Sequence, residues 1–156
     1  MAAATANRDG KRQPGEYVAY TGASGIHYYK NTLIMKNGVA ILPAAQGAGA
    51  SNARFLGVAA NEVNLAGNLG TSNAILNIWK TGIFTFTAQG TGASPHIGQR
   101  AYALDDQTVG VSAATPVLYV GEITAISPTT GSYRVFIDPA INEQFVSGLS
   151  GFSIQN

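Results

Sequence analysis

Charged residues are scarce in this chain. Only 11% of its 156 residues are Asp, Glu, Lys or Arg, against about 25% in an average soluble domain. A protein that stays dispersed by itself normally keeps a charged surface, so we expect this chain to hold much of its surface against other protein. The formal net charge is +1, and no overall field therefore attracts nucleic acid or acidic lipid.

Cysteine and long apolar runs are also missing. Without cysteine, the chain has no disulfide framework, no thiolate metal ligand and no thiol nucleophile. No run approaches the roughly 18 apolar residues of a membrane-spanning helix, and the first residues lack the basic and apolar regions of a secretory signal. We therefore expect one domain, since domains commonly span about 100–150 residues, and no membrane partner.

The sequence lacks every catalytic pattern that we sought. His27 and His96 have neither carboxylate neighbours nor ligand spacing, so we interpret them as loop or surface residues and expect no metal site. Asp105 and Asp106 are typical of a turn, with a weak cation site as the alternative. No phosphate-binding loop, nucleophile elbow or dinucleotide fingerprint occurs. We expect a protein that is not an enzyme and has no cofactor.

What the chain does contain is a series of short β-type runs. Residues 33–42 place Asn37 and Gly38 between two apolar stretches, which predicts a hairpin with a type I′ turn. Residues 83–87 alternate Phe and Thr, and this period of two indicates a half-buried strand with the phenylalanines inside. Further strands are expected at 17–20, 54–60, 74–79, 99–104, 117–126 and 133–137, of which the last two form a hairpin.

Glycines and turns complete the prediction of the fold. Gly57 indicates close approach of a neighbouring backbone, and Gly121 a β-bulge. Many short strands with almost no helix predict an all-β fold, either a small β-barrel or a β-sandwich. Because the chain has little charge to protect its edge strands, we expect closure into a barrel or pairing across subunits.

The two ends of the chain differ from its middle. Residues 1–14 are small and polar and predict either a disordered tail or an extended arm that becomes ordered on a partner. Residues 15–138 form the β-rich domain. In residues 139–156, apolar side chains recur at helical spacing, but Gly148 and Gly151 interrupt them. We expect a turn or two of helix over 142–147 and an apolar end that docks on the domain or on a neighbouring subunit.

A candidate partner interface combines the basic arm, the tyrosines that follow it and the apolar tail. Tyrosine is favoured at protein interfaces, although half of these tyrosines would face the core in the simplest alternative. The basic cluster could meet phosphate or an acidic protein surface, but no interleaved aromatic side chains suggest base stacking, and we expect no direct nucleic-acid partner. The candidate residues are Arg8, Lys11, Arg12, Tyr17, Tyr20, Tyr28, Tyr29, Phe145, Leu149 and Phe152.

The order of several short segments resembles a known family. These segments are 54–61 (RFLGVAAN), 81–86 (TGIFTF), 97–109 (IGQRAYALDDQTV), 120–126 (VGEITAI) and 133–137 (YRVFI). Together they are similar to the capsid decoration, or cement, proteins of tailed bacteriophages, a family first catalogued as a recombinase-like domain of unknown function. The similarity covers roughly residues 30–138 and depends on the order and spacing of the segments, because each one alone is a common small-residue strand.

The resemblance implies a small all-β protein that binds the outer surface of an expanded icosahedral head. Its partners would be the major capsid protein and itself, as a homotrimer or a dimer, on a virion assembled after synthesis in the host bacterial cytoplasm. The family offers no catalytic residues to transfer, and the arm and tail lie outside its pattern. A cement protein stabilises the shell against internal DNA pressure because it binds the mature lattice in preference to other states.

Two other functions remain open from the residues. The chain could be another virion β-module, such as a tail or spike component, or a glycan-binding surface domain. A sugar site would need exposed aromatic side chains beside polar ones, and Trp79 with Tyr119 is the pairing that the sequence offers. Trp79 follows an apolar run, which favours a buried position for it.

Overall fold

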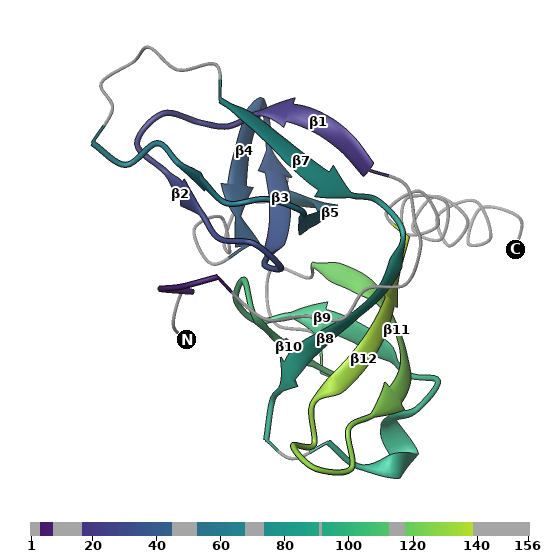
Figure 1. The fold of residues 1–156 in the computed structure, drawn as a ribbon. Helices are drawn as coiled ribbons and strands as arrows, with labels where there is room; N and C mark the ends of the chain where they lie inside the picture. Colours follow the sequence, from purple (N-terminus) through teal and green to yellow (C-terminus); the bar gives the residue numbers. More distant parts are fainter. Residues whose placement is uncertain are drawn as a thin grey trace, which may run out of the picture.

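The structure, a computed structural model, describes residues 4–7, 17–44, 53–67, 74–90, 92–112 and 118–138. Within these ranges the regular structure is almost entirely β-strand, with one short 3₁₀ turn, η1 (Ser94–His96). This confirms the expected all-β class. The strands form two main bodies, a five-stranded open sheet and a closed five-stranded barrel, with a two-stranded ribbon beside the sheet (Figure 1).

The open sheet is antiparallel throughout. Its strands, in spatial order, are β1 (Tyr17–Thr21), β7 (Ile75–Trp79), β5 (Ala53–Ala59), β3 (Leu33–Asn37) and β4 (Ala40–Pro43). The small ribbon pairs β2 (His27–Tyr28) with β6 (Val63–Asn64). The sheet therefore has two edges, β1 and β4, which lie at opposite ends of its strand order.

The barrel confirms the prediction of closure. Its strands, in order around the barrel, are β10 (Thr108–Gly110), β8 (Gly82–Ala88), β12 (Tyr133–Ile137), β11 (Tyr119–Ile126) and β9 (Arg100–Ala103). β10 pairs with β8 in parallel and with β9 in antiparallel orientation, which completes the ring. β11 and β12 form the expected hairpin. Each barrel strand thus has a hydrogen-bonded neighbour on both sides.

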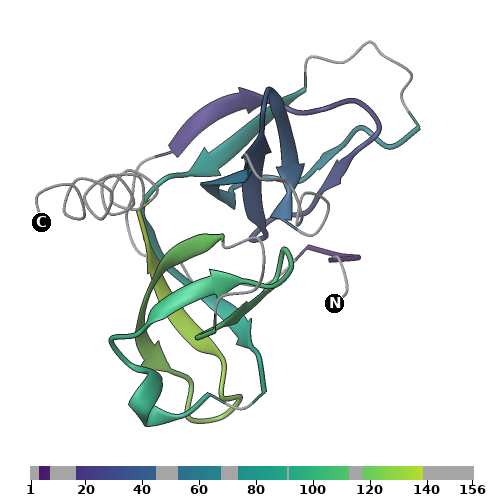
Figure 2. The same ribbon diagram turned by 180° about the vertical axis from the view of Figure 1, so that it is seen from behind.

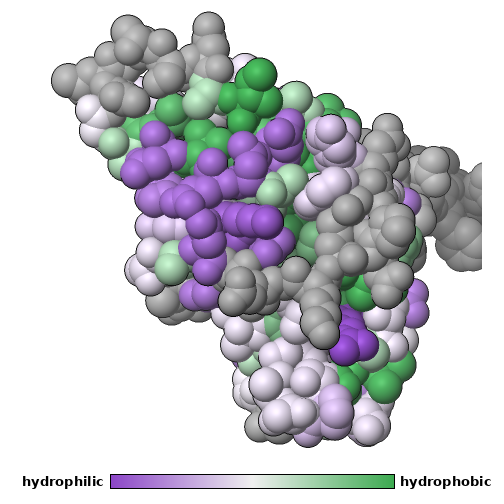
Figure 3. Space-filling model, viewed as in Figure 1, coloured by the Kyte–Doolittle hydropathy of each residue, from purple (hydrophilic) through white to green (hydrophobic). Residues whose placement is uncertain are grey.

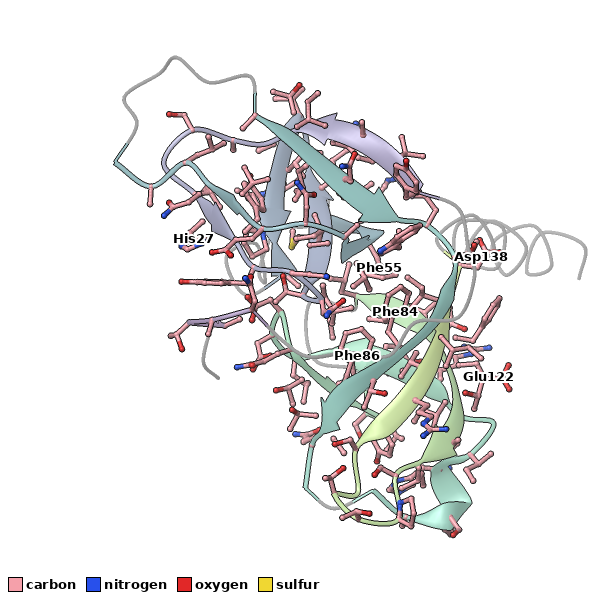
Figure 4. The ribbon with its side chains drawn as sticks, viewed as in Figure 1. His27, Phe55, Phe84, Phe86, Glu122 and Asp138 are labelled. Atoms are coloured by element: carbon pink, nitrogen blue, oxygen red, sulfur yellow. The ribbon has the colours of Figure 1, made fainter. Side chains whose placement is uncertain are left out.

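One apolar core joins the barrel to the sheet. Phe84 and Phe86 on β8 point into the barrel, while Thr87 on the same strand is exposed, as the alternating pattern predicted. Phe55 on β5 belongs to the same cluster, and Figure 4 shows it facing Phe84 across the junction. The chain crosses from sheet to barrel between Trp79 and Gly82, so β7 and β8 run on as one bent ribbon (Figure 2).

A second core covers the other face of the sheet. Ile34, Leu76 and Ile78 point away from the barrel and pack against Tyr28 of the ribbon and Leu65 just after it. Both faces of the open sheet are therefore covered, one by the barrel and one by the ribbon side.

The β3–β4 hairpin forms as expected, but its turn is displaced by one residue. Asn37 pairs with Ala40, so the two turn residues are Gly38 and Val39 rather than Asn37 and Gly38. Gly38 has a φ of 58°, while neither Asn37 nor Val39 has a positive φ. A positive φ at the first turn position alone is typical of type II′ and not of type I′. This register leaves Val39 at the tip, 97% exposed.

Both glycine predictions are confirmed. A Cβ on Gly57 would lie 2.1 Å from the carbonyl oxygen of Trp79, and its φ is +147°. A Cβ on Gly121 would lie 1.9 Å from the carbonyl oxygen of Phe136, and the pairing of β11 with β9 changes register between Tyr119 and Gly121. At each position only glycine allows the two backbones to approach so closely.

Candidate interaction surfaces

The four tyrosines of the predicted interface lie in different environments. Tyr17, on β1, is 57% exposed, and its ring meets the ring of Trp79 edge-on with 4.8 Å between centroids. Tyr20 is half-buried and packs against the second core. Its hydroxyl accepts a hydrogen bond from Lys80 Nζ at 3.2 Å. Of this pair, Tyr17 offers the larger surface to a partner.

Tyr28 lies in the core and does not belong to the accessible surface. It is fully buried, and its hydroxyl donates to the carbonyl oxygen of Ile41 at 2.6 Å and accepts from the backbone N–H of Ala23 at 2.7 Å. Burial raises the pKa of this hydroxyl. A tyrosine with its ring packed and its hydroxyl bonded in both roles has nothing left for a partner, which corrects the interface prediction at this position.

Seven predicted interface residues remain, and the structure describes one of them, Tyr29. Tyr29 is half-buried, and its ring stacks on His27 with 4.0 Å between centroids. The other six lie outside the described residues: Arg8, Lys11, Arg12, Phe145, Leu149 and Phe152.

A polar cluster surrounds His27 on the β2–β6 ribbon, where Figure 3 shows a gathering of hydrophilic surface. Glu62 Oε1 lies 2.8 Å from His27 Nε2, and Asn7 donates a side-chain hydrogen bond to Glu62 Oε2. The hydrogen bonds from Asn7 and then His27 lower the pKa of Glu62. No carboxylate lies near His27 in the sequence, because Glu62 is 35 positions away and only strand pairing brings the two side chains together.

Part of the predicted N-terminal arm is docked on the protein's own domain. The backbone N–H of Ala4 donates to both carboxylate oxygens of Asp106, at 2.9 and 3.1 Å, and both residues are buried. Asn7 Oδ1 accepts from the backbone N–H of Lys30 at 3.0 Å. Residues 4–7 thus connect the β9–β10 turn of the barrel to the ribbon. Asp105 makes the expected turn, because its Oδ1 accepts from the N–H groups of Gln107 and Thr108, whereas Asp106 holds the arm.

Within the described ranges we find no group of three or more side chains that could hold a metal ion. An open depression of about 460 Å³ lies at the end of the barrel, between η1 and the β11–β12 turn. It is lined by Gly92, Ser94 and residues 126–131, which offer hydroxyl and backbone groups and no ionisable side chain. Nearby, His96 is half-buried and its Nδ1 lies 2.5 Å from the hydroxyl of Tyr133.

The β1 edge of the sheet has free backbone groups with a defined alternation. The N–H of Gly22 bonds the carbonyl oxygen of Ala74, and the N–H of Ala60 bonds that of Asn77. Because bonding direction alternates along an antiparallel strand, the even-numbered residues of β1 point their backbone groups at β7. The odd-numbered residues Tyr17, Ala19 and Thr21 therefore point theirs away from the sheet, where no described strand pairs with them.

The β4 edge, in contrast, is blocked. Since Asn37 and Ala40 close the hairpin, Ile41 and Pro43 are the β4 residues whose backbone groups point outward. The carbonyl oxygen of Ile41 is occupied by the hydroxyl of Tyr28, and Pro43 has no N–H to donate. Of the two sheet edges, β1 alone has a complete outward series of donors and acceptors within the described residues.

The aromatic pair considered for sugar binding is divided between two local contacts. The ring of Trp79 meets Tyr17 and packs partly against the shared core. The ring of Tyr119 meets Tyr102 edge-on with 5.9 Å between centroids, and burial raises the pKa of its hydroxyl. Trp79 is half-buried, so the expected burial applies to it in part.

Across the described ranges no helix is long and apolar enough to cross a bilayer. Comparison of the chain with protein-family models, with curated proteins and with solved structures finds no match.

Proposed function

We propose that this chain is a non-enzymatic structural protein of a virion that binds the outer surface of a mature phage head and stabilises the capsid lattice. Its partners would be the major capsid protein and further copies of itself, as a trimer or a dimer. The observation that carries the proposal is the character of its exterior, which is poor in charge and includes an unprotected sheet edge.

Two features of the described residues support this reading. Asp105 and Asp106 are buried, so the exterior is even poorer in charge than the composition suggests. Tyr17, Val18 and Ile75 expose apolar surface along β1 and its neighbour β7. Such a surface is costly for an isolated protein but suits one that neighbours cover. The resemblance of five short segments, in their order, to capsid decoration proteins favours the same function.

A decoration protein acts by mass action. If the chain binds the expanded lattice and not the immature one, each bound copy lowers the free energy of the mature shell relative to its competitors. No reacting group is needed for this, and many weak contacts add up over the repeated lattice.

Co-sedimentation with heads of the virus that encodes the chain tests the proposal. We expect binding to expanded heads, full or emptied, no binding to procapsids, and a higher rupture temperature for decorated heads. Chains lacking residues 1–14 or 140–156 should occupy fewer sites if the arm and tail contribute, while a Val39→Lys variant at the exposed hairpin tip provides a control. Equal binding to procapsids, or no binding to either particle, contradicts the proposal. Glycan-array binding without head binding would favour the glycan-binding alternative.

A further inference from the structure

The outward-pointing backbone groups of β1 form a pattern that is complementary to itself. Tyr17, Ala19 and Thr21 each present one N–H and one C=O on the free side of the sheet, spaced two residues apart and centred on Ala19. A second copy of the strand, turned by 180° about an axis that passes beside Ala19, presents the matching series of acceptors and donors. An antiparallel partner with this spacing satisfies all of these groups.

We propose that two copies of this chain pair antiparallel through their β1 edges, with the two-fold axis at Ala19. In this register Ala19 faces Ala19 of the second copy, and Tyr17 faces its Thr21. The pairing adds about six backbone hydrogen bonds and joins two five-stranded sheets into one of ten strands. The interface is isologous, as in most protein dimers.

The side chains of β1 permit this pairing. No residue from Tyr17 to Thr21 is charged and none is proline, and its pairing with β7 has no bulge. Charge, proline and bulges are the devices by which edge strands avoid one another. Tyr17, Ala19 and Thr21 share a face of the sheet, so each Tyr17 ring would lie beside the small side chains of Ala19 and Thr21 across the pair.

Neither the barrel nor the other edge of the open sheet offers a second site for β1. The barrel is closed, and the β4 edge is blocked by the Tyr28 hydroxyl and Pro43. A head-to-tail arrangement of β1 on β4, which could build rings or open filaments, would find the Ile41 carbonyl already bonded and no N–H at Pro43. Self-pairing of β1 would cover the one edge of the described five-stranded sheet that β4 does not form.

A pair held by five residues of each strand buries a small area, and such interfaces are weak. We expect a dissociation constant in the micromolar range for the free protein. Where a lattice holds copies side by side, the paired fraction should be close to complete. The inference specifies the self-association within the proposed function. It rests on β1 alone and is tested without capsids, so it and head binding can fail independently.

Opposite charges at Ala19 test both the partner and the register, because Ala19 is exposed and faces Ala19 of the second copy in the proposed pair. By sedimentation velocity on the full-length chain, wild type should show a concentration-dependent dimer. Ala19→Lys and Ala19→Glu should each weaken the dimer by about tenfold or more, since like charges then face each other. An equimolar mixture of the two variants should recover the dimer. Val39→Lys and Val39→Glu, matched charges at the hairpin tip, should leave the dimer unchanged.

A single introduced cysteine gives a second measurement, because the natural chain has none. Directly opposite residues of a hydrogen-bonded antiparallel pair have Cα atoms about 5.5 Å apart, within the range that a disulfide spans. Under mild oxidation Ala19→Cys should form a covalent dimer much faster than Val39→Cys. Circular dichroism and thermal unfolding establish that each variant is folded.

Three outcomes would overturn the inference. The first is a wild-type protein that stays monomeric at the highest soluble concentration while Ala19→Cys crosslinks no faster than Val39→Cys. The second is a dimer or trimer that neither charge at Ala19 weakens. The third is a pair of weakened variants whose mixture does not recover, which would mean that β1 meets some other surface.

Discussion

The barrel and the open sheet are built from similar short strands, but they differ in whether their outermost strands have a hydrogen-bonded neighbour. The barrel leaves no edge, because β10 pairs with both β8 and β9. The sheet has two edges, of which β4 is blocked by Tyr28 and Pro43, while β1 has no strand beside it among the described residues. Closure into a barrel protects a strand from unwanted pairing and needs no charged side chain. In a chain with few charges, we therefore expect a partner to cover any edge that is not closed. β1 is therefore the part of the sheet that we expect a partner to cover.

The two bodies nevertheless share one apolar core. The core that fills the barrel continues onto the sheet through Phe55, Leu33 and Met35, and residues 4–7 bridge from the barrel turn to the ribbon. The difference between barrel and sheet therefore concerns their edges, and we expect the two bodies to unfold together.

The largest effect should come from the shared core. Phe86 is fully buried on β8, and Phe86→Ala should lower the free energy of unfolding by about 3–5 kcal/mol through lost burial and a cavity. Urea denaturation followed by tryptophan fluorescence, which reports on Trp79 in the sheet, should give the same midpoint as circular dichroism. Two separate transitions would contradict a common core. Thr87→Ala, at an exposed position on the same strand, should change stability by less than about 0.5 kcal/mol.

Close backbone approach can be tested in each body. Gly57→Ala in the sheet and Gly121→Ala in the barrel would each force a Cβ against a carbonyl oxygen, at a cost of about 1–3 kcal/mol in the free energy of unfolding. Gly57→Ala should be the more damaging, because its positive φ adds strain. Gly67→Ala is the matched control, since it shares the positive φ but meets no atom within 4 Å, and should cost about 1 kcal/mol. Equal losses at Gly67 and Gly57 would mean that φ alone matters.

Tyr28 protects the blocked edge of the sheet. Tyr28→Phe should lower the free energy of unfolding by about 1–3 kcal/mol, because the carbonyl of Ile41 and the N–H of Ala23 lose their partner.

The same residue gives the protein an alkaline limit. Burial raises the pKa of Tyr28, Tyr119 and Tyr133 above the ordinary value of 10.0. Stability is then complete below that value and is lost as pH rises through the folded-state pKa, because the unfolded chain gives up these protons first. Thermal unfolding from neutral to strongly alkaline pH should show this loss, and Tyr28→Phe should reduce its slope. A flat profile in wild type would contradict the burial of these hydroxyls.

The smallest effect should be at the docked arm. The lowered pKa of Glu62 comes from its bonds with Asn7 and His27, so their contribution is present above the ordinary carboxyl pKa and is lost as pH falls through the lowered one. Glu62→Gln should speed hydrogen exchange at residues 4–7 without a measurable change in global stability, since Glu62 is exposed. Glu122→Gln, at an exposed position on β11, should leave exchange at residues 4–7 unchanged.

Local patterns in the sequence predicted a large part of the fold. The alternation of Phe and Thr on β8, the hairpin at 33–42, the close approach at Gly57 and the bulge at Gly121 all depend on neighbouring residues and the geometry of one strand. The sequence predicts the hairpin turn one residue too early, because Asn37-Gly38 is the preferred local pair. The observed register instead brings Leu42 and Ala44 to the shared core beside Met35.

Contacts between distant residues were the part that sequence patterns missed. Tyr28 resembles the other tyrosines along the chain, and only the position of Ile41 shows that its hydroxyl closes a sheet edge. Asp106 resembles a turn residue in the sequence, and only the structure shows that the backbone N–H of Ala4, 102 positions away, donates to it. His27 acquires its carboxylate only through the pairing of β2 with β6. No periodicity or motif carries such information, because the two residues of each contact are separated by no regular number of positions in the sequence.

By itself the sequence determined the all-β class, the positions of most strands and the shortage of charge, since each of these follows from residue type and short-range alternation. The tertiary structure alone decided which strands close into a barrel, which sheet edge is blocked and which edge stays open. These outcomes depend on strand order and register, which are set when distant segments pack together, and an edge exists only in relation to the strands that are or are not beside it.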